Sequence, residues 1–358
     1  MKTMNKRTIY LSVCSLAMTL AMYNCKKKDE PFPTEPPTEL VNKINDITVT
    51  PITITAPAAV TTTASSITAS PEAAAMGTAL SSLASSGTVP ASLTATGTAV
   101  TTAIPAADMA TLSAVTPATL AAVKAGGAMP ADVKAALDKA AANPAIQAYL
   151  PKFTFPTVGG KTINGRVGAV GAATTTATTA AATGVEAVEG VLVEDACLVA
   201  AEAAFQTAKT KLDAARDAEI VKVQAAYTAA ITPLAAAETT CQASVNYTAQ
   251  RASVDTQIAQ ALANLEAGKA ALTAAGLYDA FVTLVNVQAL GAYSGINLLE
   301  SADKAACTAA RTARTASAAA ARDLDLSKVQ AEYTTKIAAA NVVKTELLAS
   351  CHNQGGGN

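Results

Sequence analysis

The stretch AARDAEIVKVQAAYT, at residues 214–228, returns as AARDLDLSKVQAEYT at residues 320–334. The two copies agree at Arg, Asp, Lys, Val, Gln and Tyr as well as at alanine, so chance convergence of Ala-rich sequence does not explain them. We infer that the C-terminal part of the chain contains a duplicated unit. The equivalence of Tyr227 and Tyr333 indicates matched packing roles for them rather than a ligand site.

Both copies lie in sequence that strongly favours helix. Between residues 191 and 275 the only strong helix breakers are Pro233 and Gly268, and residues 303–350 contain neither proline nor glycine. Ala, Leu, Glu, Lys, Arg and Gln dominate these stretches, and they are the best helix formers. The sequence therefore predicts an all-α fold made of long, Ala-rich helices.

The N-terminus has the layout of an export signal. A basic start at residues 2–7 is followed by the apolar run IYLSVCSLAMTLAMY and then by Asn24 and Cys25. An ordinary cleaved signal and an uncleaved anchor helix are alternative interpretations of this segment.

The run LAMYNC followed by KKKDE resembles the signal of bacterial lipoproteins, in which the thiol after the cleavage site receives diacylglycerol. Met22 and Asn24 depart from the usual lipobox and resemble the relaxed lipoboxes of spirochaetes. The resemblance implies that residues 1–24 are removed as a signal peptide and that Cys25 carries fatty acyl chains such as palmitate. Because Lys26 rather than Asp follows the cysteine, it also implies an outer-membrane location.

Four further cysteines constrain the architecture, because an exported chain meets an oxidising environment in which disulfides form. Cys197 and Cys241 are separated by the same 44 residues as Cys307 and Cys351. Pairing within each copy needs a turn, whereas a continuous helix of this length holds its ends roughly 66 Å apart. In an antiparallel hairpin, Cys197 faces Cys351 and Cys241 faces Cys307 in a single register. We therefore predict these two disulfides in a pseudo-two-fold hairpin, with either slight unwinding of the helices or a break near Pro233 to keep both pairs in register.

The composition divides the mature chain into segments. We predict a Pro/Thr-rich tether at 25–70, short Ala-rich helices at 71–155, a Gly/Thr-rich linker at 156–190, a helical bundle at 191–352 and a disordered tail at 353–358. Within the bundle, 247–276 is expected to form one helix, with Gly276 as its stop. The stretch Ala280–Leu299 is uncharged and long enough to span a bilayer. Its Asn, Gln and Gly residues favour a core helix packed over the hairpin instead.

The sequence contains no convincing catalytic, cofactor-binding or metal-binding constellation. The only histidine, His352, follows Cys351 near the C-terminus, so a hydrolytic triad lacks a base. The formal net charge is −1, which gives no electrostatic case for nucleic-acid binding. We expect neither an enzyme nor a small-molecule substrate.

These observations lead to a non-enzymatic, lipid-anchored surface lipoprotein with a structural, spacer or host-contact role. A protein partner is possible, and the membrane contact is the lipid anchor. One alternative is an accessory lipoprotein that faces the periplasm and binds an envelope partner through residues 277–299. Another is a membrane-active helical bundle that inserts this segment.

Overall fold

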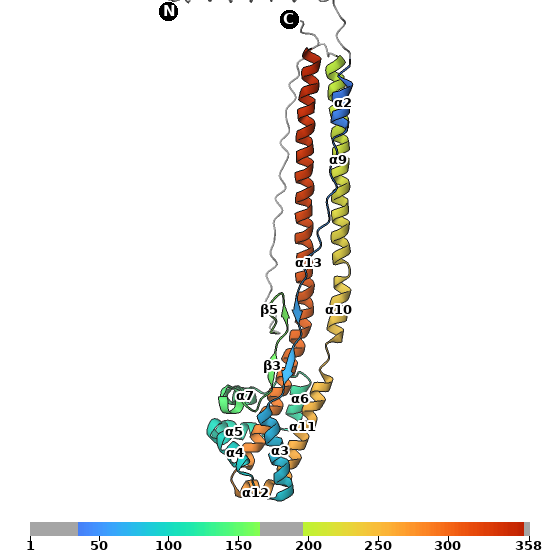
Figure 1. Cartoon of the computed structure of the whole chain (residues 1–358). Coiled ribbons are helices and arrows are strands. Elements are labelled where there is room, and N and C mark those ends of the chain that lie inside the picture. Colours follow the sequence, from blue (N-terminus) through green and yellow to red (C-terminus); the bar gives the residue numbers. More distant parts are fainter. Residues whose placement is uncertain (1–34, 165–195, 354–358) are drawn as a thin grey trace, which may run out of the picture. The chain divides into compact units, whose positions relative to one another are not determined.

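The computed structural model describes residues 35–164 and 196–353, and this part of the chain is helical apart from short strands (Figure 1). The predicted all-α fold is confirmed. The helices are α2 (Thr38–Asn45), α3 (Pro71–Ser86), α4 (Ala91–Ala103), α5 (Ala106–Ser113), α6 (Pro117–Lys124), α7 (Ala131–Ala142), α8 (Pro144–Gln147), α9 (Ala196–Ile231), α10 (Leu234–Ser244), α11 (Thr248–Ala267), α12 (Lys269–Ala274) and α13 (Tyr278–Asn353). The strands are β1 (Thr62–Thr63), β2 (Ser66–Thr68), β3 (Lys152–Thr154), β4 (Thr157–Val158) and β5 (Lys161–Thr162).

The chain divides into two compact units whose segments interleave in the sequence. Among the described residues, unit 1 contains 35–57, 196–229 and 319–353, and unit 2 contains 58–164 and 230–318. This differs from the predicted single bundle at 191–352, because the long helix α13 contributes to both units. The predicted signal peptide, Cys25 and residues 165–195 and 354–358 lie outside the described residues.

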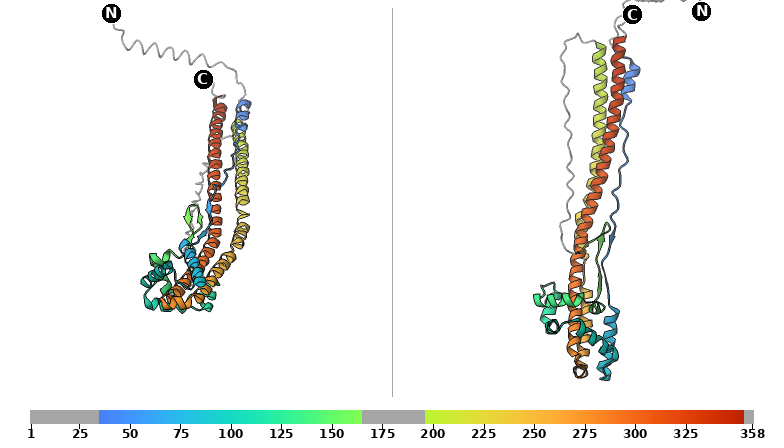
Figure 2. Two further views of the ribbon diagram at one scale, coloured as in Figure 1. Left: turned by 60° about the horizontal axis from the view of Figure 1, so that its bottom comes forward. Right: turned by 90° about the vertical axis from the view of Figure 1, so that its left-hand side faces the viewer.

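Unit 1 is an antiparallel hairpin of α9 and the C-terminal part of α13 (Figure 2). Small buried side chains line its core, including Ala201, Ala208 and Ala340, which are at most 1% exposed. Such residues let helix backbones approach closely. The disulfide between Cys197 and Cys351 closes the hairpin at one end, with its Cα atoms 5.7 Å apart.

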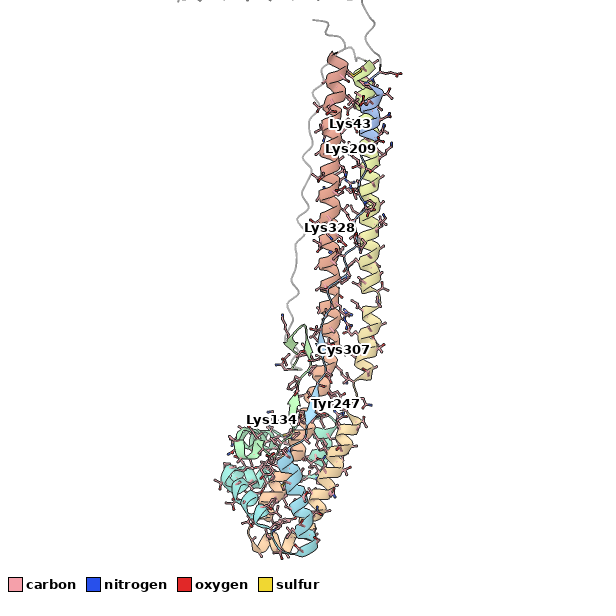
Figure 3. All side chains as sticks on the ribbon, viewed as in Figure 1. Lys43, Lys134, Lys209, Tyr247, Cys307 and Lys328 are labelled. Atoms are coloured by element: carbon pink, nitrogen blue, oxygen red, sulfur yellow. A yellow bond between two sulfur atoms is a disulfide. The ribbon has the colours of Figure 1, made fainter. Side chains whose placement is uncertain are left out.

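The second disulfide lies in unit 2 and has the predicted pairing. Cys241 of α10 is bonded to Cys307 of α13, and their Cα atoms are 5.8 Å apart (Figure 3). Helix α9 ends at Ile231 and α10 begins at Leu234, so the chain has a break at Pro233, one of the two ways in which the cysteine register could be kept.

The core of unit 2 forms around the first turns of α13. Short helices α3–α8 pack their few large residues against Phe281, Leu284 and Leu290, none of which is exposed to solvent. The boundaries of these helices follow the predicted signals. Ser70 caps α3 ahead of a proline, and Gly87 ends it with a φ of 68°, a backbone conformation that favours glycine.

Polar residues inside the apolar stretch of α13 donate hydrogen bonds to carbonyls in the last turns of two short helices. Asn286 donates to the carbonyl of Leu112 in α5 at 2.8 Å, and Asn297 donates to that of Val123 in α6 at 2.7 Å. Each carbonyl also accepts a backbone amide from just beyond its helix, so the side-chain amide occupies its second lone pair. These amides are therefore structural members of a protein core.

Several segment predictions need correction. Residues 247–276 are not one helix, because the chain turns at Gly268, where a Cβ would lie 2.6 Å from Leu83 of α3. The stretch 280–299 is a core helix as expected, yet it packs in unit 2 rather than over the hairpin. Residues 157–162 form the paired strands β4 and β5 instead of a linker. The predicted tether contains helix α2, with Ile44 buried, and strands β1 and β2, and between them it is hydrogen-bonded to helix side chains while remaining largely exposed.

By length and composition alone, the described residues contain two helical stretches able to cross a membrane, Ala196–Ala267 and Tyr278–Cys351, and a third if the bent pair α5–α6 counts as one span. In the second stretch, 67% of the most apolar window is buried inside the protein. That window is occupied largely by protein contacts.

Gly295 offers a test of the packing in unit 2. A Cβ at this position would lie 2.1 Å from Cζ of Phe153 in β3. We expect Gly295→Ala to lower the free energy of unfolding by about 2–3 kcal/mol, because the phenyl ring must leave its site. In the control Gly77→Ala, the new methyl group meets nothing within 4 Å, and stability should rise by about 0.5–1 kcal/mol. Urea unfolding followed by circular dichroism measures both, and equal midpoints would contradict the packing.

Candidate functional site

The repeated sequence builds a symmetric layer of side chains across the hairpin of unit 1. Arg216 lies over the ring of Tyr333 at 4.6 Å, and Arg322 lies over the ring of Tyr227 at 4.7 Å. Each contact joins one copy of the repeat to the other. The tyrosines thus have the matched packing roles expected from the sequence, and the hairpin has local two-fold symmetry.

The same symmetry places two buried carboxylates in equivalent positions. Glu219 is 5% exposed and Asp325 is 1% exposed. Each is paired with the lysine one helical turn later, Lys222 and Lys328 respectively, the latter at 2.9 Å. Buried carboxylates are rare in proteins unless they are paired and hydrogen-bonded.

The carboxylates hold an extended segment of the chain, residues 46–57, which we call the strap (Figure 3). The amide of Ile52 donates to Glu219 at 3.4 Å. The amide and the hydroxyl of Thr55 donate to Asp325 at 2.7 and 2.5 Å. Lys328 also donates to the Thr55 hydroxyl at 2.7 Å. We call Glu219, Asp325 and their two lysines the clasp.

Upstream of the strap, α2 fixes the chain near the closed end of the hairpin. Ile44 is fully buried with Leu347 in the hairpin core, and Lys43 forms an ion pair with Glu346 at 2.6 Å. Farther along, the amide of Thr50 donates to Glu332 at 3.1 Å. The strap therefore runs antiparallel to α13 along unit 1.

The clasp alters the ionisation of Asp325. Burial by itself would raise the pKa of this carboxyl, but the hydrogen bonds from Thr55 and Lys328 outweigh burial and leave the pKa below its ordinary value. Hydrogen bonds from Thr50 also lower the pKa of Glu332. Asp325 is thus an anion at neutral pH, and it binds the strap through charge-assisted hydrogen bonds.

The clasp was not anticipated from the sequence, which was interpreted as a tether over residues 25–70. A signal was present, because the repeat aligns Glu219 with Asp325 and Lys222 with Lys328. Acidic side chains on a helix are ordinarily solvated, so this match did not by itself indicate burial or a partner. Nothing in the sequence identified the strap as that partner.

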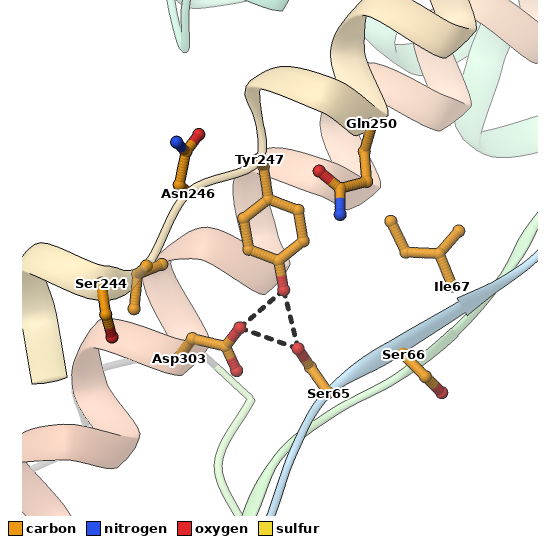
Figure 4. Close-up of a pocket in the computed structure, with 9 residues that line it drawn as sticks. Ser65, Ser66, Ile67, Ser244, Asn246, Tyr247, Gln250 and Asp303 are labelled. Atoms are coloured by element: carbon orange, nitrogen blue, oxygen red, sulfur yellow. Dashed lines mark hydrogen bonds between the residues drawn. The ribbon is translucent and has the colours of Figure 1, made fainter.

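An open cleft of about 400 Å³ lies in unit 2, where α10 meets α11 (Figure 4). In it the Tyr247 hydroxyl donates to Asp303 at 2.6 Å, and the Ser65 oxygen lies 2.7 Å from both the Asp303 carboxylate and the Tyr247 oxygen, either of which can accept its one proton. Burial, and then the hydrogen bond to Asp303, raises the pKa of Tyr247 to about 12. The phenol therefore stays protonated at neutral pH, and its role is to fix the strand segment to the helices.

The remaining predicted residues are placed as follows. Cys197, Cys241, Cys307 and Cys351 all form disulfides, whereas Cys25 lies outside the described residues. Within residues 35–164 and 196–353, no group of His, Cys, Asp and Glu side chains has the arrangement of a metal site. The segment 277–299, considered for partner or membrane contact, is mostly buried, although Leu298 is 50% exposed.

Comparisons of this chain with protein-family models, with curated proteins and with solved structures found no match.

The clasp predicts a defined pH dependence. Because the folded pKa of Asp325 is lowered, its charge stabilises the hairpin above the unfolded pKa of about 4, and this contribution is lost as the pH falls through the folded pKa. We expect Asp325→Asn to cost about 1–2 kcal/mol at pH 7 and nothing near pH 2. The control Asp323→Asn removes an exposed ion pair with Arg322 and should cost less than about 0.5 kcal/mol. Urea titrations at both pH values check this, and a pH-independent loss in Asp325→Asn would contradict the ionised clasp.

Proposed function

We propose that this chain is a non-enzymatic lipoprotein, anchored through acyl chains on Cys25 to the outer membrane. Its disulfide-locked hairpin serves as a structural, spacer or partner-contact element at the cell surface. The observation that supports this most is that all four cysteines of the described residues join helices in disulfides. Such bonds persist in exported proteins and are rare in reducing compartments.

The position of the strap supports the structural part of the proposal. The twelve residues between Cys25 and α2 span at most about 43 Å. Helix α2 follows directly and is fixed beside Glu346, near the hairpin end that Cys197 and Cys351 close. An anchor at Cys25 would therefore lie near this closed end. The hairpin helices of unit 1 extend about 50 Å from it.

Labelling with an alkyne fatty acid tests the anchor. The wild-type chain should incorporate the label and remain with membranes, and Cys25→Ser should lose the label and become soluble. A Cys14→Ser variant is the matched control, because it changes the other N-terminal cysteine and should leave labelling intact. Wild-type chain without label would refute the lipoprotein assignment.

Protease treatment of intact cells tests the surface location. Cleavage of the hairpin, detected with an antibody to unit 1, is the expected result. A labelled chain that protease reaches only after the outer membrane is opened would instead establish the periplasm-facing alternative.

A further inference from the structure

The clasp recognises the strap mainly through its backbone. The contacts to Glu219 and Asp325 come from two amides, three residues apart, and from one threonine hydroxyl. The strap buries little of its own surface around these bonds, since Ile54 is 39% exposed. Recognition of this kind requires an extended chain and only a short sequence pattern, as in other modes of peptide binding by main-chain hydrogen bonds.

The helical side of this contact is duplicated, whereas the strap is not. Exchanging the two hairpin helices by the local two-fold carries Glu219 onto Asp325 and Lys222 onto Lys328. The clasp therefore offers equivalent carboxylates to an extended chain that runs in either direction. A clasp that binds only one strap in one direction does not need two equivalent carboxylates.

We propose that the clasp of unit 1 is a docking groove for extended polypeptide, and that its partner is the strap of a second copy of this chain. The strap is the segment that the groove demonstrably fits, and every copy carries one. Chains anchored on one membrane would meet at a high local concentration, which favours exchange between copies. This last step rests on the proposed lipid anchor, while the groove itself does not.

The strap is also suited to leave the groove. Residues 50, 51, 53, 54, 56 and 57 are exposed, and this part of the strap is held by hydrogen bonds to the clasp and to Glu332, whereas Ile47 and Val49 at its start pack in the hairpin core. Segments with few buried apolar contacts open locally at a lower free energy than the core. Helix α2 has its own anchors at Lys43 and Ile44, so local opening need not release it.

A labelled peptide with the sequence of residues 46–58 tests the groove on the full-length chain in detergent. Thr55→Pro removes the amide and hydroxyl that bind Asp325 while keeping an extended backbone. We expect this variant to bind the peptide at least tenfold more tightly than the wild-type chain. Thr53→Pro is the matched control, because residue 53 is exposed, and it should behave as wild type.

Adding Asp325→Asn to Thr55→Pro should weaken peptide binding about tenfold, because the charged acceptor is lost. If Thr55→Pro does not bind the peptide, or if adding Asp325→Asn leaves the affinity for the peptide unchanged, the clasp is not a docking site for extended polypeptide. Two differently tagged full-length copies should co-purify after mixing, and excess peptide should compete with their association. Peptide binding without co-purification would overturn the second copy as partner. Both measurements are made in detergent and are independent of lipidation, so they can fail while the proposed function stands.

Discussion

Replacing Cys197 and Cys351 with serine should lower the free energy of unfolding by about 4–5 kcal/mol, the largest loss that we expect from any paired substitution in unit 1. The bond links residues 154 apart in sequence, and a disulfide restricts the unfolded chain more as the loop grows. With the bond between Cys241 and Cys307 intact, the effective loop shrinks to about 90 residues, which lowers the expected loss by only a few tenths of a kcal/mol.

Hydrogen exchange read by mass spectrometry separates the two units in this experiment. In the Cys197/Cys351 variant, amides near both ends that the bond joined should lose protection, since those helix ends then fray. The Cys241/Cys307 variant is the matched comparison, with a loop of 66 residues and a loss of protection in α10 and the facing part of α13. Unchanged protection and unfolding midpoints, or free thiols in peptide maps of the wild-type chain, would contradict the role of these bonds.

The cysteine pairing could be predicted because it depends on helix geometry alone. Equal spacing of the cysteines and the absence of breakers in 308–350 allowed an antiparallel register, and Ala-rich helices allowed the short Cα separation. The same geometry left open whether slight unwinding or a break at Pro233 keeps the register, and the structure has the break. Cysteine spacing, helix breakers and alanine content are local or periodic features, so they can be read directly from a single sequence.

The clasp and the division into units could not be predicted in this way. The strap contacts α13 across a sequence separation of 270 residues, between Thr55 and Asp325. Its Pro- and Thr-rich composition is the same whether it is held or free, because the bonds use backbone amides that every sequence has. The path of α13 through two units likewise depends on which surfaces its neighbours cover, and composition does not encode this.

For the apolar start of α13, the sequence indicated that the helix lies in a protein core, but it did not indicate which helices surround it. Length and hydropathy allowed a membrane span, whereas Asn286 and Asn297 favoured a protein core. In the structure these amides bind carbonyls of Leu112 and Val123, so the polar residues were the informative ones. The partner helices came from residues 106–124, which the sequence marked only as short and Ala-rich.

Phe281→Ala should destabilise unit 2 by about 3–5 kcal/mol, the largest effect that we expect from a single substitution. The ring is fully buried among the short helices, and removing it leaves a cavity that small neighbours such as Ala280 and Ala289 cannot fill. Urea unfolding measures the loss, and hydrogen exchange should show that α3–α8 lose protection while the hairpin of unit 1 keeps it.

Leu298→Ala is the matched control, because it removes a large apolar side chain from the same stretch at a position that is 50% exposed. Its cost should stay below about 1 kcal/mol, since the side chain is half in solvent already. The pair distinguishes a protein core from a surface for membranes or partners. If Leu298→Ala abolished association with membranes or cells while Phe281→Ala left unit 2 stable, the stretch 280–299 would have to be a contact surface, and the core described for unit 2 would be wrong.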